Sequence, residues 1–109
     1  MSASFGELIS AARKKKRISQ RELASRIKKL NDGKPISAQY LNDIEHDRRN
    51  PPSEFIIEQL AKELGLSKER LCLVAGTLPA EDRETISKAQ PEAVDSAWSA
   101  FRKTIRRKP

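Results

Sequence analysis

Two short stretches of this sequence carry side chains that can recognise a polar partner. Gln20 follows Ser19, and Gln39 lies two positions after Ser37. A glutamine amide both donates and accepts hydrogen bonds, so it can pair bidentately with N6 and N7 of adenine. The sequence offers few groups for catalysis, because the single histidine, His46, lies in a basic turn without a cysteine or serine nucleophile beside it. We therefore expect a binding protein and not an enzyme.

Positive charge is concentrated in a few places along the chain. The 109 residues carry a formal net charge of +7, and basic residues gather at positions 13–17, 48–49 and 102–108. Such clusters suit a polyanion, and double-stranded DNA is the first candidate partner. Lysine-rich helix faces can equally be solvated surface, and charge alone leaves that alternative open.

The single cysteine, Cys72, excludes an internal disulfide. It lies among leucine, valine and alanine, so we expect a small buried hydrophobic side chain. One histidine and one cysteine cannot assemble the usual zinc ligand sets, and no metal or cofactor is expected. The sequence shows neither the apolar core of a signal peptide nor a window long enough to cross a membrane. We expect a cytoplasmic protein, associated with the nucleoid if it binds DNA.

Helix-forming patterns occupy almost the whole chain, and no segment alternates apolar and polar residues long enough to predict a strand. Ser4 and Ser19 each have a glutamate three residues later, which is the pattern of a capping box. The patterns predict helices near residues 5–16, 20–30, 38–45, 54–64, 68–75, 81–88 and 92–105. The fold class is therefore all-α, with a five-helix domain over residues 1–76 and a short helical extension over residues 77–109.

Apolar residues mark the expected inner faces of these helices. Phe55, Leu73 and Val74 belong to the apolar faces of the fourth and fifth helices. In the extension an apolar stripe at helical spacing consists of Val94, Trp98, Phe101 and Ile105. The stripe either packs back on its own chain or contacts a second subunit or another protein, and the pattern leaves both open.

Several groups of residues between positions 5 and 76 form one spaced pattern. They are Leu8, Ala12 and Arg13; Ile18 to Ala24; Ser37, Tyr40, Leu41, Ile44 and Glu45; Arg48 to Pro51; and Leu60, Ala61, Leu64, Gly65 and Leu66. Together they resemble the phage repressor and Cro-like (XRE-type) helix-turn-helix regulators, over about two-thirds of the chain. The resemblance implies a lambda-repressor-like domain of five helices that binds double-stranded DNA.

The resemblance also implies roles for polar groups in the two central helices. Gln20 is expected to bond a phosphate, Gln39 to read a base, and Ala38 to touch a thymine methyl group. The full set of expected DNA contacts is Arg17, Gln20, Arg21, Ser37, Ala38, Gln39, Tyr40, Asn42, Arg48 and Arg49.

Three details near the central helices carry separate expectations. One of Arg48 and Arg49 is expected at a phosphate, while the other pairs with Glu45, itself an internal acceptor. The turn between the second and third helices is usually short in the family, and residues 28–34 lengthen it here. We therefore expect a longer second helix followed by an extended turn. Whether Lys28, Lys29 and Lys34 contact phosphate is left open. Asp47 stands where the family usually has glycine, and we expect it to adopt the left-handed conformation.

A single recognition helix reads only a few base pairs, so specificity usually requires a two-fold dimer on half-sites about 34 Å apart. The fifth helix and the extension offer the dimer surfaces. The sequence therefore predicts a transcriptional repressor that acts as a homodimer on a palindromic operator. The alternative is an antitoxin that represses its own promoter and binds a toxin through its tail. The tail, with Gly76 to Pro79 followed by a later Pro91, also resembles a subset of these regulators that carry a short helical C-terminal region. Some of that subset are relieved by a partner metalloprotease, which makes a regulatory protease a further candidate partner.

Overall fold

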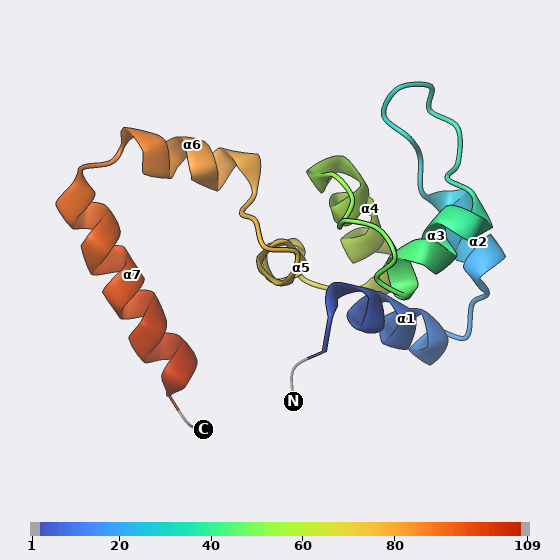
Figure 1. Cartoon of the computed structure of the whole chain (residues 1–109), viewed down its shortest axis with the longest axis horizontal. Coiled ribbons are helices and arrows are strands. Elements are labelled where there is room, and N and C mark those ends of the chain that lie inside the picture. Colours follow the sequence, from blue (N-terminus) through green and yellow to red (C-terminus); the bar gives the residue numbers. More distant parts are fainter. Residues whose placement is uncertain (1–2, 108–109) are drawn as a thin grey trace. The chain divides into compact units, whose positions relative to one another are not determined.

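The computed structural model describes residues 3–107, and every regular element in that range is an α-helix. The helices are α1 (Phe5–Lys15), α2 (Gln20–Arg26), α3 (Ala38–Glu45), α4 (Glu54–Leu64), α5 (Lys68–Val74), α6 (Ala80–Lys88) and α7 (Pro91–Arg106). The chain divides into two compact units, Met1–Leu78 and Pro79–Pro109, and each is described by itself. The all-α prediction is confirmed (Figure 1).

The first unit is built around one apolar core. Helix α3 packs on α1 and α2, while α4 packs on α1 and α5. The fully buried side chains of this core are Ile9, Leu23, Ile27, Leu41, Ile57, Leu60, Leu71 and Cys72. The prediction that Cys72 is a buried small side chain is therefore confirmed. Burying each large aliphatic side chain contributes about 1.5–3 kcal/mol, so the core holds α2 and α3 in a fixed relation.

Serine hydroxyls begin several of these helices, as the sequence predicts. Ser4 accepts from the backbone N–H of Glu7 at 3.1 Å, and Glu7 closes the capping box by accepting from the backbone N–H of Ser4. The Ser19 hydroxyl accepts from Glu22, but the Glu22 carboxylate pairs with Arg26. The second box is consequently only half formed, and a salt bridge within α2 takes the place of the other half.

The prediction that the second helix reaches Leu30 is wrong. Helix α2 ends at Arg26, and Ile27 has extended backbone angles, with φ −105° and ψ 122°. Ile27 and Ile36 are both buried, and the N–H of Ile36 donates to the carbonyl of Ile27 at 2.9 Å. A short antiparallel pairing of residues 28 and 35 follows, so the extra residues form a hairpin loop and not additional helix.

Three apolar residues of α4 and α5 also depart from prediction. Phe55, Leu73 and Val74 were expected on inner faces, but their side chains are exposed. The core on these two helices is already filled from the opposite side by residues such as Ile57, Leu60 and Leu71. These three side chains therefore lie on the outer faces of α4 and α5.

The second unit consists of α6 and α7, and neither helix buries a side chain. Pro91 occupies the first turn of α7, as predicted. Trp98 and Phe101 stack at 5.0 Å between ring centroids, and the Arg102 guanidinium lies 5.9 Å from the Trp98 centroid. Trp98, Phe101 and Ile105 are exposed while Val94 is partly buried, so most of the apolar stripe on α7 is uncovered. None of the described helices is long and apolar enough to cross a membrane.

Candidate nucleic-acid interface

The first turn of α3 presents polar and small side chains to solvent. Ser37, Ala38 and Gln39 are exposed, whereas Leu41 and Ile44 on the same helix are buried in the core. The Ser37 hydroxyl caps the helix by accepting from the N–H of Tyr40 at 3.0 Å. Helix α3 is therefore anchored by its apolar face, and its N-terminal turn is left free to enter a groove of DNA.

Gln39, the expected base reader, has a partner within α3. Its Nε2 donates to Asp43 Oδ1 at 3.0 Å. The bond joins two side chains one helical turn apart and lies at the surface, where water can replace it. Base reading by the Gln39 amide would exchange this surface bond for bonds to a base.

Gln20 and Asn42 are brought together by the packing of α2 on α3. Gln20 Nε2 donates to Asn42 Oδ1 and to Glu45 Oε1, each at 3.0 Å. Both amide hydrogens are thereby used inside the protein. A phosphate contact by the Gln20 amide would require one of them to be released, so this side chain first of all fixes α2 to α3.

The prediction that Glu45 pairs with Arg48 or Arg49 is wrong. Its partner is Arg13 of α1, whose Nε lies 2.7 Å from Oε2 and whose Nη2 lies 3.0 Å from Oε1. The Arg13 guanidinium also donates from Nη1 to the carbonyl of Ile18 at 2.9 Å. Arg13 follows the buried Phe5 and Ile9 at intervals of four residues, and this spacing places it on the inner face of α1.

The electrostatic environment of Glu45 keeps it ionised. Burial acts to raise the pKa of this carboxyl, but the hydrogen bonds from Arg13 and Gln20 and the charge of Arg13 outweigh burial and lower it from its ordinary value. The pair is consequently a charged, fully hydrogen-bonded link between α1, α2 and α3. It fixes the helix that carries the candidate reading residues.

The Asp43 carboxylate lies close to both of the arginines that follow α3. Arg49 Nε lies 3.3 Å from Asp43 Oδ2, Arg48 Nη1 lies 3.7 Å from Oδ1, and the Arg49 guanidinium lies 5.2 Å from the centroid of the Tyr40 ring. Burial acts to raise the pKa of Asp43, but the hydrogen bonds from Gln39 and Arg49 and the charges of both arginines lower it. Both arginines are exposed, so phosphate can compete with Asp43 for them.

Asp47 adopts the left-handed conformation expected of it, with φ 56°. Its carboxylate accepts from the backbone N–H of Gly6 at 3.0 Å and from the Ser4 hydroxyl at 2.5 Å. A Cβ atom at Gly6 would clash with the backbone carbonyl oxygens of Ile44 and Glu45, so glycine is required where α1 approaches the end of α3. These contacts tie the start of α1 to the turn after α3.

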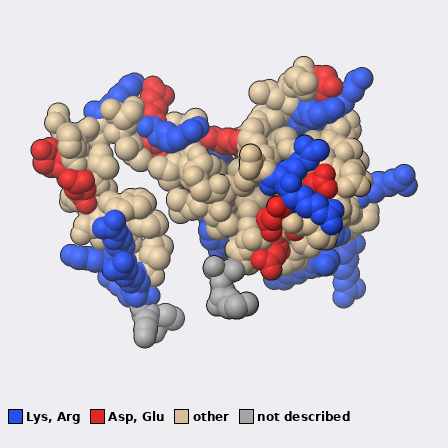
Figure 2. Space-filling model, viewed as in Figure 1, with Lys and Arg blue, Asp and Glu red and all other residues tan. Residues whose placement is uncertain are grey.

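Basic side chains surround these helices. Arg17, at the turn into α2, has φ 58°, and both Arg17 and Arg21 are exposed. In the view of Figure 2, lysine and arginine side chains project from the edge of the five-helix unit and also lie on its near face, where aspartate and glutamate lie among them. An exposed helix turn with a basic surround matches the requirements of a helix-turn-helix, in which phosphate contacts position the protein and the second helix reads bases.

Fold and site together define a helix-turn-helix DNA-binding protein, and comparison with known proteins agrees. Residues 6–77 match the family model described as "Helix-turn-helix domain". A solved structure described as the SinR protein/SinI protein complex is similar with a TM-score of 0.52 and 24% identity, over 92% of this chain and 98% of that one. No curated protein gave a significant sequence match. The chain belongs to the helix-turn-helix family, and it is an XRE-type DNA-binding regulator of transcription.

Proposed function

We propose that this regulator is a sequence-specific repressor that binds a palindromic operator as a homodimer. The observation that carries the proposal is the exposed first turn of α3, in which Ala38 and Gln39 face solvent while Leu41 and Ile44 hold the helix to the core. Arg17, Arg21, Arg48 and Arg49 would bind phosphates. On this account the protein works by binding in the cytoplasm, at the nucleoid, and not by catalysis.

The homodimer is supported by the second unit. Helices α6 and α7 bury none of their own side chains, and Trp98 and Ile105 remain 47% and 65% exposed. A pair of helices this short cannot build a sufficient core alone and usually requires association. A second copy of the same unit would cover the stripe and also place two reading helices on one DNA molecule.

A second candidate is that the stripe binds a different protein. The similar solved structure is described as a complex of two named proteins, SinR and SinI. In this chain such a partner would be a toxin, which would make the protein an antitoxin that represses its own promoter, or a regulatory protease. Both candidates share the DNA-binding unit and differ only in what covers α7.

Binding to DNA should be specific and strongly dependent on salt, because Lys and Arg displace counterions from phosphate. We expect a duplex selected from a random pool to bind at least about 10³-fold more tightly than a scrambled duplex. Its affinity should fall by about 10³-fold between 50 and 200 mM salt. Titrations of both duplexes at several salt concentrations measure the two effects. Equal, weak binding of the selected and scrambled duplexes would contradict the proposed function.

A further inference from the structure

The loop of residues 27–36, between α2 and α3, is an ordered hairpin. The N–H of Lys29 donates to the carbonyl of Lys34 at 2.8 Å, and the N–H of Gly33 donates to the carbonyl of Lys29 at 3.0 Å. Gln59 of α4 holds the base, since its Oε1 accepts from the N–H of Lys28 at 2.7 Å and its Nε2 donates to the carbonyl of Lys28 at 2.9 Å. The loop is therefore fixed to the rest of the unit.

The fixed loop carries a surplus of positive charge. It contains three lysines, Lys28, Lys29 and Lys34, but only one acidic residue, Asp32. Asp32 lies 3.7 Å from the Lys29 ammonium, whereas the Lys34 ammonium has no carboxylate partner among residues 3–107. Leu30 is 75% exposed near the tip. Figure 1 shows the loop projecting beyond α2 and α3.

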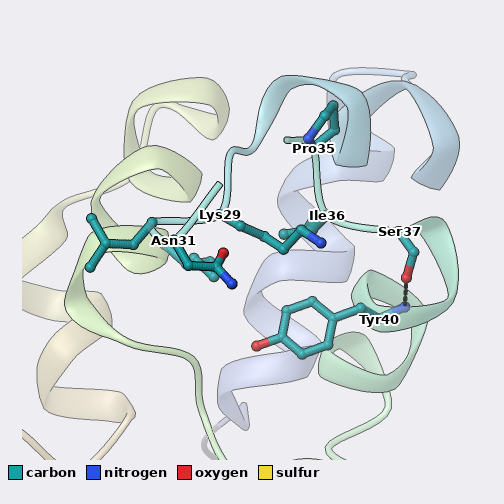
Figure 3. Close-up of a pocket in the computed structure, with 8 residues that line it drawn as sticks. Lys29, Asn31, Pro35, Ile36, Ser37 and Tyr40 are labelled. Carbon is teal, nitrogen blue, oxygen red and sulfur yellow. Dashed lines mark hydrogen bonds between the residues drawn. The ribbon is translucent and has the colours of Figure 1, made fainter. Parts of the chain in front are cut away.

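The loop also borders the candidate reading turn. Ile36 leads directly into Ser37, the cap of α3. A hollow of about 540 Å³ lies between the loop and α3. Figure 3 shows Lys29 and Asn31 on the loop side of this hollow and the Tyr40 ring on the α3 side. The loop and the exposed turn of α3 are therefore neighbours on the surface of the first unit.

We propose that this loop is a second DNA-binding element, in which Lys29 and Lys34 bind phosphates of the strand that flanks the bases read by α3. The inference rests on the proposed function and adds a contact that the shorter turn of its family would not make. Ordering loop residues costs about 1–2 kcal/mol each in conformational entropy. A loop that only connected α2 to α3 would therefore gain little from being held in place by the hydrogen bonds of Gln59. Because a phosphate carries no sequence information, the loop adds affinity and position but not base preference.

The test compares Lys29→Ala and Lys34→Ala with Lys62→Ala, which removes an exposed lysine from the last turn of α4. Each loop variant should bind the selected and the scrambled duplex about five- to tenfold more weakly than the unchanged protein. Each should also reduce the slope of log affinity against log salt by about 0.9, the value for one lost phosphate contact. Lys62→Ala should change neither quantity.

Neutral methylphosphonate linkages, placed one at a time in the selected duplex, test the contact directly. At one or two linkages beside the half-site the unchanged protein should lose affinity, while the matching lysine variant should lose none. Unchanged salt slopes in both loop variants would overturn the proposal while leaving the proposed function intact. If the unchanged protein selects no sequence at all, it is the proposed function that fails.

Discussion

Removal of the chain after Gln90 should leave a folded monomer that has lost most of its affinity for a two-fold operator. The truncated protein keeps the whole core of the first unit, whose buried members all lie between Phe5 and Cys72. It loses the stripe on α7 that we propose as the dimer contact. Without the second reading helix, the gain from linking two half-sites disappears, and operator affinity should fall by about 10²–10⁴-fold.

Sedimentation, far-ultraviolet circular dichroism and operator titration measure the three parts of this result. A matched pair of substitutions in the full chain avoids the large deletion. Trp98→Ala, within the stripe, should weaken the dimer, whereas Ser99→Ala, one position on and outside the stripe, should leave it unchanged. A truncated protein that remains dimeric would contradict the proposed contact and leave the stripe for a different protein.

Arg13→Ala should destabilise the first unit by about 3–5 kcal/mol, because it leaves the buried Glu45 carboxylate without its main partner. Glu45 is 5% exposed, and Arg13 makes three hydrogen bonds that link α1 to the end of α3 and to the turn before α2. Urea unfolding followed by circular dichroism measures the loss. Lys14→Ala, at the exposed neighbouring position, should cost less than about 0.5 kcal/mol.

The double variant Arg13→Leu with Glu45→Leu removes both charges. It distinguishes the stabilisation contributed by the ion pair from the cost of leaving a single charge buried. It should be less destabilised than the two single substitutions added together, since neither charge is left buried alone. If Arg13→Ala and Lys14→Ala lower the free energy of unfolding equally, the buried pair does not hold α1 to α3 in solution.

Local signals were sufficient for most of the fold. Serine caps and apolar spacing predict the starts of α1 and α2, because a cap and its first turn involve residues only three positions apart. The same reasoning predicts the exposed turn of α3, since Leu41 and Ile44 must face inward. Asp47 shows that one departure from the family pattern can be anticipated from the tolerance of aspartate for positive φ.

The errors arose where partners are distant in sequence. Lys28 lies outside α2 because the side chain of Gln59, 31 positions away, hydrogen-bonds both its backbone N–H and its backbone carbonyl. Glu45 bonds Arg13, 32 positions away, although Arg48 and Arg49 are closer along the chain. A basic run such as residues 13–17 is read most simply as one exposed surface. Only the spacing of Arg13 from Phe5 and Ile9 marks it as the inward member.

The most direct measurement of the central claim, that α3 reads bases, is the DNA sequence selected by the protein and by its Gln39→Ala variant. The unchanged protein should select a two-fold motif, and Gln39→Ala should lose preference at one base step in each half-site. The variant should bind the original motif about 1–3 kcal/mol more weakly, the value of one bidentate contact. An unchanged motif, selected with unchanged strength by Gln39→Ala, would contradict base reading by this face of α3.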